Sequence, residues 1–294
     1  FLQAGEEKTV YFVLGLTTDK QAVIDRFKNV EAESAAIFEK GEKNIPYGSV
    51  RVRCPEPQIN RVMNYWAEHQ VRYCMLGKKA VRDNAQLATV ENPVMQWGAI
   101  IEKYLATIEE CIVHQYSDGH SVLLWYPIVE NTVYSDPSTW LTFAICEYIK
   151  ESGDIAYLDK KFAYLDGGEG TVYEHLKKAV EWFTAKENRG PNGLPKIYHA
   201  DWNDALNIPD DNAESVLMAM LICKAYKEIA GVARYIGDEQ YAQEVEGYYE
   251  ALKKRTNEVA FNGEYYVRAF SKFGVVGDKT CENGGKIYVN PQSW

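Results

Sequence analysis

The spacing of apolar residues along this chain predicts mostly helices. Within residues 59–66, four apolar residues are spaced i, i+3, i+4 and i+7, as on one face of a helix: Ile59, Val62, Met63 and Trp66. Asp136-Pro137 is typical of a helix start, with Asp as N-cap and Pro at the first helical position. The same periodicity predicts further helices at about 94–113, 171–187, 213–236 and 239–260.

The two ends of the chain have a different pattern. Lys8–Leu16 is a run of β-branched and aromatic residues that predicts one strand, whose partner strands we expect to lie outside this chain. A helix to about Lys40, capped by Thr18 or Asp19, is expected next. Residues 41–57 are rich in Gly and Pro, which indicates a linker and a domain boundary near residue 56. After Phe261 the composition favours short strands and turns.

A weak internal repeat indicates how the helices are arranged. Gly153 and Gly237 each end a predicted helix, and an Asp that can cap the next helix follows each of them. Successive helix pairs without strands between them predict stacked αα-hairpins, either as a solenoid or as a closed toroid. The polar and aromatic clusters fall in the loops, which places a candidate active site at one mouth of such a toroid.

Composition and charge exclude some classes of partner. The formal charge is −10 and the pI is near 5.2, which argues against nucleic acid and against an anionic membrane as partners. Neither a membrane-spanning run nor a signal peptide is visible. The six cysteines show no ligand spacing, and Cys146 and Cys223 stand inside apolar helical runs, so we expect reduced, buried thiols. We therefore expect a cytoplasmic protein.

The stretch Leu194–Asn207, LPKIYHADWNDALN, has the composition of a sugar site. It places two carboxylates, Asp201 and Asp204, around the indole of Trp202. An aromatic face covers the apolar side of a pyranose, and nearby apolar surface raises a carboxyl pKa toward the value that a general acid needs. The alternative is an Asx-rich turn whose Trp belongs to the core. Composition alone leaves both interpretations open.

Three other clusters carry weaker signals. Residues 81–86, VRDNAQ, combine side chains that can bind sugar hydroxyls, and a surface ion pair is the alternative. Arg72–Lys79 could bind an anion or form a solvated helix end. His114 and His120 are six residues apart with one Asp between them, a spacing that matches no common metal site, so no metal is expected.

Four separated motifs resemble glycoside hydrolase family 94, the cellobiose and chitobiose phosphorylases and their relatives. They are HADWNDALN preceded by NRGPNGLPKI, VRDNAQ, SDPSTWLTFAICEYIKESGDIAYLD and GGKIYVNPQSW, in the family's order. The resemblance covers nearly the whole chain and implies a mainly α fold, an (α/α)6 barrel that is incomplete here. It implies that residues 1–16 are the last strand of a β-sandwich domain, 17–56 a helical linker and 57–294 the first part of the barrel.

The resemblance also implies roles for single residues. Asp204 matches the general acid, Trp202 the adjacent aromatic at the sugar site, and Arg72 an arginine at the phosphate site. The implied substrate-binding residues are Arg82, Asp83, Gln86, Trp202, Asn203, Asn290 and Trp294. Asn290 stands where the cellobiose enzymes have an acidic residue, and Leu87 stands where an Asp commonly follows the Gln. Both departures argue against cellobiose itself as substrate.

The reaction implied is inverting, reversible phosphorolysis of a β-linked glucoside, which gives α-glucose 1-phosphate and a shortened acceptor. One convincing acid without a paired base agrees with it, because phosphate arrives as an anion and needs no base. Inorganic phosphate is then a co-substrate, and no cofactor is expected. Asp204→Asn should abolish general acid catalysis, whereas Asp201→Asn should be far milder.

Partners and alternatives complete the sequence-based expectations. The resemblance implies a longer enzyme that acts as a homodimer, so the remainder of that enzyme is an expected partner, and this chain expressed alone should expose apolar surface, aggregate or pair. Two alternative functions stay open. One is an inverting glycoside hydrolase on the same barrel, and the other is a non-catalytic carbohydrate-binding module.

Overall fold

The computed structural model describes residues 101–281 almost continuously. It covers residues 101–125, 128–203 and 205–281, with shorter pieces at Gln3, 5–8, Val10, 19–26, Lys28 and 52–66. The chain divides into two compact units, Phe1–Tyr47 and Gly48–Trp294, each of which is described by itself. In the first unit, α1 spans Lys20–Arg26, and Ala22 N donates a hydrogen bond of 3.0 Å to Asp19 Oδ1. Asp19 is thus the cap that the sequence offered as one of two candidates.

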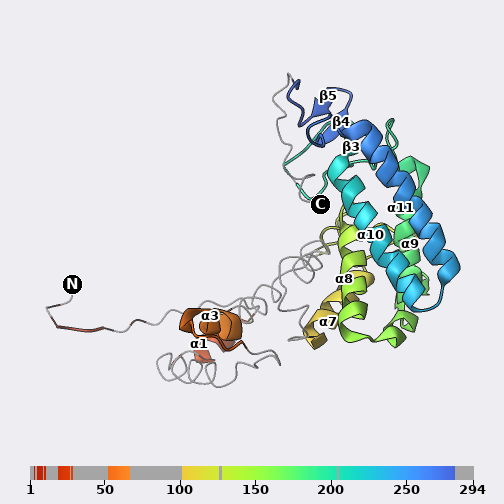
Figure 1. The fold of residues 1–294 in the computed structure, drawn as a ribbon. Coiled ribbons are helices and arrows are strands. Elements are labelled where there is room, and N and C mark those ends of the chain that lie inside the picture. The colour runs from red at the N-terminus through yellow and green to blue at the C-terminus, as the bar shows by residue number, and fades with distance from the viewer. Residues whose placement is uncertain are drawn as a thin grey trace. The chain divides into compact units, whose positions relative to one another are not determined.

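The second unit is mainly helical, as predicted (Figure 1). Its first described helix is α3, Pro57–Arg61, followed by the π-helical turn η1, Val62–Trp66. The long helices are α7, Ile101–Ile112; α8, Pro137–Ser152; α9, Val172–Thr184; α10, Val216–Tyr235; and α11, Glu239–Ala260. Short 3-10 turns are η2, Ile155–Asp159, and η3, Lys186–Asn188. The strands are β1, Lys161–Ala163; β2, Glu169–Thr171; β3, Glu214–Ser215; β4, Ala269–Ser271; and β5, Gly274–Val276.

One feature of the helices was not predicted, and one detail of the predictions is wrong. The apolar face over α3 and η1 is exposed at Ile59, Val62 and Trp66. Periodicity predicts an apolar face but not whether another element covers it. Asp136 stands before α8 as predicted, yet its side chain does not cap the helix. Its Oδ2 instead accepts a hydrogen bond of 2.8 Å from Trp140 Nε1, one turn into the helix.

Burial alternates along the series of helices, which indicates helical hairpins with an inner and an outer member. α8 and α10 are buried along most of their length, and α10 packs against both α8 and α11. α11 buries only one stripe of side chains: Ala242, Val245, Leu252, Thr256 and Ala260. α10 and α11 run antiparallel and side by side (Figure 1). The shared core contains large side chains that are almost fully buried, including Trp140, Phe143 and Tyr226, and the burial of such apolar area is the main stabilising term.

Local signals fix the ends of these helices. Thr171 and Glu174 form a reciprocal capping box at the start of α9. Gly153 adopts a left-handed conformation, φ 68°, at the end of α8. The side chain of Asp238 accepts a hydrogen bond from Tyr241 N and starts α11 at the residue that the sequence predicts. The Gly-Asp pairs therefore do end one helix and begin the next element.

A small sheet lies at the end of the unit where α10 begins (Figure 1). Its antiparallel order is β3-β4-β5, and β1 pairs with β2 in a separate hairpin. β3 leads directly into α10, since Ser215 is the last residue of β3 and the N-cap of the helix. A second, smaller core lies beside this sheet and contains Ile197, Leu206, Ala213 and Ala269. The sheet therefore connects the helices to the stretch that the sequence singles out.

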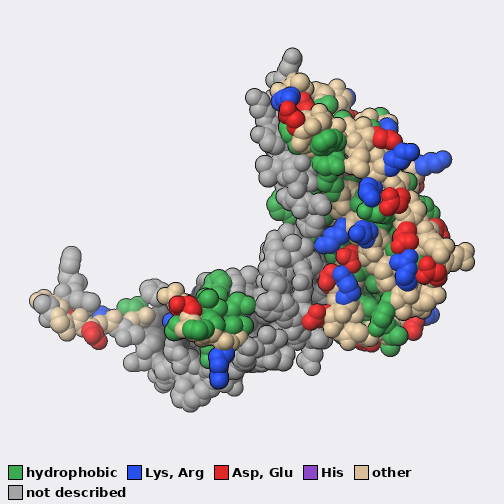
Figure 2. Space-filling model, in the orientation of Figure 1, with side chains coloured by type: hydrophobic (Ala, Val, Ile, Leu, Met, Phe, Trp, Pro, Cys, Tyr) green, Lys and Arg blue, Asp and Glu red, His purple; other side chains and the backbone are tan. Residues whose placement is uncertain are grey.

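The surface carries both signs of charge. Figure 2 shows Lys and Arg side chains interspersed with Asp and Glu over the helices of the second unit. The face in view therefore offers no continuous basic surface of the kind that binds a polyanion. Among the described residues, no helix is both long enough and apolar enough to cross a lipid bilayer.

Candidate active site

The segment that enters the candidate site is held on both edges by backbone hydrogen bonds. On one edge, Ile197 N donates to Ala213 O at 2.8 Å. On the other edge, His199 N donates to Val133 O at 3.1 Å. Isolated bridges join Lys196 to Glu214 and Tyr134 to Tyr198. The sequence predicts a loop here, and residues 195–200 form isolated bridges to the neighbouring segments rather than a strand.

Asp201 is completely buried in an ion pair. Its exposure and that of Arg268 are both 0%, and Arg268 Nη2 donates to Asp201 Oδ1 at 2.6 Å. Ser215 Oγ donates to Asp201 Oδ2 at 2.6 Å. The Nε of Arg268 has no hydrogen-bond partner within the described part of the chain. A carboxylate that is buried and bonded through both oxygens cannot reach a substrate, so Asp201 is not available as a general acid.

Ser215 links this ion pair to the start of α10. Its hydroxyl accepts a hydrogen bond of 3.0 Å from Met218 N, which satisfies a backbone donor in the first turn of the helix. The same hydroxyl accepts a hydrogen bond of 3.3 Å from Arg268 Nη1 and donates one to Asp201. The start of the loop, the N-terminus of α10 and the residue before β4 are therefore held together by one buried network.

The loop after Asp201 is closed by side chains that bond to its own backbone. Asn203 N donates to Asp201 Oδ1 at 3.0 Å, and Ala205 N donates to Asn203 Oδ1 at 3.1 Å. Leu206, near the other end, is buried in the smaller core. The Asx-turn interpretation is thus correct for Asp201 and Asn203. The loop is thus anchored at Asp201 and at Leu206.

Trp202 is the outward-facing aromatic residue of this loop. Its exposure is 41%, so the alternative of a core tryptophan is wrong. An exposed indole on an anchored loop suits stacking against the apolar face of a sugar. Its role in binding stays a prediction.

A second buried carboxylate supports the turn that precedes the segment. Glu214 accepts hydrogen bonds from Asn192 N at 2.9 Å, Asn192 Nδ2 at 2.7 Å and Leu194 N at 2.9 Å. Burial raises the pKa of Glu214, against the lowering effect of these donors. Gly190 packs on this side chain so closely that a Cβ there would lie 2.3 Å from Glu214 Cγ. The run NRGPNGLPK is therefore a rigid support for the segment that leads to Asp201.

The histidines of the stretch His114–His120 make separate local contacts. His114 Nδ1 is 2.7 Å from Glu110 O, and its ring stacks on Trp125 at 4.5 Å. His120 Nδ1 is 2.6 Å from Asp118 Oδ1. Among the residues that the structure describes, no group of three or more His, Cys, Asp or Glu side chains forms a metal site.

Most of the other predicted site residues cannot be compared with the structure. Trp202 and Asn203 are described, and they share the anchored loop. The predicted residues that lie outside the described ranges are Arg72, Arg82, Asp83, Gln86, Asp204, Asn290 and Trp294. Their roles stay predictions.

Sequence reasoning missed the residues that hold the loop. Arg268 stands in the run NGEYYVRAF, where a charged residue within a predicted strand was an available signal of a buried ion pair. Its partner Asp201 is 67 residues away in sequence, and no local pattern connects the two. Glu214 and Ser215 precede an apolar run, a pattern that is typical of a helix start and does not indicate a role in holding the loop.

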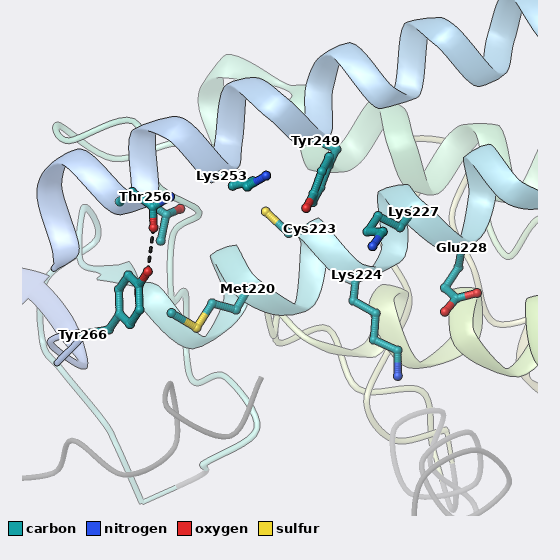
Figure 3. Close-up of a pocket in the computed structure, with 10 residues that line it drawn as sticks. Met220, Cys223, Lys224, Lys227, Glu228, Tyr249, Lys253, Thr256 and Tyr266 are labelled. Atoms are coloured by element: carbon teal, nitrogen blue, oxygen red, sulfur yellow. Dashed lines mark hydrogen bonds between the residues drawn. The ribbon is translucent and has the colours of Figure 1, made fainter.

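A separate cavity of about 580 Å³ lies between α10 and α11 (Figure 3). Three lysines line it, and each stands over an aromatic ring: Lys224 over Phe143, and Lys227 and Lys253 over Tyr249. At its other end, Tyr266 donates a hydrogen bond of 2.6 Å to Asn257 Oδ1. No residue of the loop 201–207 lines this cavity. It is a groove between two helices, separate from the loop 201–207.

Comparisons with known proteins agree with the sequence resemblance. Residues 114–294, more than half of the chain, match the family described as the Glycosyl hydrolase 94 superfamily, catalytic domain. The chain is 30% identical to solabiose phosphorylase from Paenibacillus borealis, across 100% of this chain and 38% of that protein. It is 26% identical to N,N'-diacetylchitobiose phosphorylase from Vibrio proteolyticus, across 98% of this chain and 40% of that protein.

A solved structure shows the same fold at low identity. The structure of a GH78 family rhamnosidase from Bacillus sp. GL1 matches with a TM-score of 0.52 and 16% identity, across 76% of this chain and 23% of that one. The chain thus spans about 40% of the length of the curated relatives reported above.

Proposed function

Because this chain belongs to the Glycosyl hydrolase 94 superfamily through its catalytic domain, we propose that it carries the acid loop of an inverting glycoside phosphorylase. The reaction is reversible phosphorolysis of a β-linked glucosyl di- or oligosaccharide to α-glucose 1-phosphate and a shortened acceptor. Two relatives with phosphorylase names support the reaction class. The proposal covers the whole protein, of which this chain supplies the residues discussed here.

The observation that carries the proposal is the division of roles within the loop. Asp201 is bonded through both carboxylate oxygens to buried partners, so its role is to fix the loop. Asp204, three residues later, is then the carboxyl group of this loop that is left to act on a substrate. Trp202 between them is exposed, as a sugar-stacking residue must be.

The chemistry of the step needs one proton donor from the protein. A phosphate oxygen attacks the anomeric carbon as the bond to the glycosidic oxygen breaks, and Asp204 gives its proton to that oxygen. In the synthetic direction the Asp204 carboxylate takes the proton from the acceptor hydroxyl. The attacking phosphate is already anionic, so a second carboxylate is not required as a base.

The finer assignments are part of the same proposal. They comprise an (α/α)6 barrel over 57–294, a strand over 1–16 and a helical linker over 17–56. We propose Arg72 for phosphate and the following residues for the sugars: Arg82, Asp83, Gln86, Trp202, Asn203, Asn290 and Trp294. A homodimeric, cytoplasmic enzyme that uses inorganic phosphate and no metal completes the proposal.

Phosphate dependence tests the reaction class. The full-length protein is incubated with β-linked glucosyl disaccharides with and without inorganic phosphate, and the anomeric configuration of the product is read by NMR. The proposal predicts release that requires phosphate and yields the α-configured sugar 1-phosphate. Equal release of free sugar without phosphate would instead identify an inverting hydrolase.

A further inference from the structure

We propose that a polar cavity between the two flanks of the loop 201–207 is an additional sugar subsite, which holds a sugar unit of the acceptor part of the substrate. This inference rests on the proposed phosphorylase function. It adds a location and a ligand class to that function, because no residue assigned above to phosphate or sugar lines this cavity.

The cavity shares its walls with the loop. Its volume is about 520 Å³, within the range of small-molecule sites. Three segments supply the lining: 132–133, the segment 196–199 before the loop, and 207–211, which begins with the last residue of the loop. The contributing residues are Thr132, Val133, Lys196, Tyr198, His199, Asn207, Ile208, Pro209, Asp210 and Asp211. A ligand bound there lies against both ends of the loop.

The lining combines hydrogen-bond donors and acceptors as a sugar requires. Lys196 is a donor, Asp211 is an acceptor, and the amide of Asn207 is both. Within the described part of the chain, neither Lys196 nor Asp211 forms a side-chain hydrogen bond or an ion pair. These groups are therefore available to hydroxyl groups of a ligand.

The same lining disfavours simple ions. A small anion would meet the carboxylates of Asp210 and Asp211, and a cation would meet Lys196. A neutral polyhydroxylated molecule avoids both repulsions and can bond to every one of these groups. The mixed charge of the wall therefore points to a sugar unit.

The wall before the loop is rigid. Tyr198 adopts φ 57°, an uncommon backbone conformation for a residue with a side chain. Its ring stacks with Trp182 at 5.8 Å, and its hydroxyl donates to Asn188 Oδ1. Burial raises the pKa of Tyr198 to about 12, so the hydroxyl keeps its proton for this bond.

The wall after the loop is tied to the small sheet. Asp210 Oδ2 accepts a hydrogen bond of 2.6 Å from Lys272 N, in the turn between β4 and β5. Asp210 Oδ1 accepts one of 3.1 Å from Asn212 N. Both walls are thus fixed before a ligand arrives, which reduces the entropy cost of binding.

The test compares two acceptors in the synthetic direction. The full-length protein carries Lys196→Met, which removes a donor, or Asp211→Asn, which replaces one charged acceptor oxygen by a donor, each with little change in side-chain size. With α-glucose 1-phosphate as donor, the KM for a β-glucosyl disaccharide acceptor is divided by the KM for glucose. The inference predicts that each substitution raises this ratio about tenfold, because only the longer acceptor reaches the cavity. Lys186→Met, which removes an exposed lysine outside the cavity, should leave the ratio unchanged.

Direct binding separates this inference from the proposed function. Titration calorimetry of the same proteins with the disaccharide should show weaker binding for Lys196→Met and Asp211→Asn than for Lys186→Met. This comparison needs no turnover, so it remains decisive if phosphate-dependent activity is absent. A KM ratio that is unchanged in Lys196→Met and Asp211→Asn, or equal disaccharide affinity in all three variants, would overturn the assignment of the cavity.

Discussion

Asp201 and Arg268 form a fully buried ion pair, which makes Asp201 a structural residue. Asp201→Asn removes the negative charge and leaves the Arg268 guanidinium buried without compensation. We predict that the free energy of unfolding falls by about 3–5 kcal/mol. The sequence alone predicts only that Asp201→Asn is milder than Asp204→Asn for catalysis, and the buried partner adds this effect on stability.

Chemical denaturation of Asp201→Asn and of the original protein checks this prediction. Asp159→Asn, at an exposed aspartate in η2, is the matched control and should change the free energy of unfolding by no more than about 0.5 kcal/mol. A loss below about 1 kcal/mol for Asp201→Asn would mean that the ion pair contributes little to the fold.

Substitution by alanine should destabilise the protein at Gly190 and stabilise it at Gly231. A Cβ at Gly190 would lie 2.3 Å from Glu214 Cγ, so Gly190→Ala forces the buried carboxylate to move. We expect a cost of about 1–3 kcal/mol. Gly231, within α10, has open space where its Cβ would stand, so Gly231→Ala should stabilise the protein by about 0.5–1 kcal/mol.

The shift of the thermal midpoint measures both effects. A lower midpoint for Gly190→Ala together with a higher midpoint for Gly231→Ala is the expected pair of results. If Gly190→Ala left the midpoint unchanged, the close contact between Gly190 and Glu214 would not be part of the folded protein.

At the scale of elements, His175 couples α9 to the loop after α7. It is buried, with Nδ1 2.6 Å from Gln115 Oε1, and burial lowers its pKa below the ordinary value of 6.5. The unfolded chain takes up a proton near pH 6.5, whereas the folded chain does so only at lower pH. Stability is therefore lost as the pH falls below about 6.5, by at most about 1.4 kcal/mol per pH unit from this group.

Unfolding free energies at pH values between 7 and 5 test this coupling. His175→Gln should remove the contribution of His175 to the slope of unfolding free energy against pH, even if it lowers stability at every pH. Gln240→Ala, at an exposed residue of α11 that does not titrate, should retain the pH dependence of the original protein. Identical slopes for His175→Gln and the original protein would show that His175 does not titrate differently on folding.

Helices were predictable because their signals are local. Asp238 and the 3.6-residue period predict α11 at 239–260, and the structure has the same bounds. β3 is two residues long and has no period from which to predict it, and it pairs with β4 through residues 54 positions apart, such as Ser215 and Ala269. β4 and β5 instead pair locally, for example Ser271 with Gly274, and fall in the part after Phe261 where the composition favours short strands.

The candidate site was predictable only in part, for the same physical reason. The composition of the stretch Leu194–Asn207 predicted a polar loop with an aromatic residue, and Trp202 is indeed exposed. The distinction between its two aspartates was not visible from composition, since both stand beside the same tryptophan. The resemblance assigned the acid role to Asp204, and only the buried partner Arg268 shows what Asp201 does instead.

For the whole molecule, the small sheet and the inner helix α10 together hold the loop. The ion pair fixes its first residue, and Leu206 fixes its end in the smaller core. A general acid has to stay in place while phosphate and sugar enter and leave, and an anchored loop provides this. We therefore predict that Asp204 delivers the proton to the glycosidic oxygen.

Phosphorolysis by Asp204→Asn tests this central claim most directly. Asn is nearly isosteric with Asp but cannot deliver a proton, so turnover of a β-glucosyl disaccharide with phosphate should fall on the order of 10²–10⁴-fold. The loss should be much smaller for an aryl β-glucoside, whose leaving group hardly needs protonation, and Asp159→Asn should match the original protein on both substrates. Equal losses on the two substrates, or full activity of Asp204→Asn on the disaccharide, would contradict the assignment of Asp204 as the general acid.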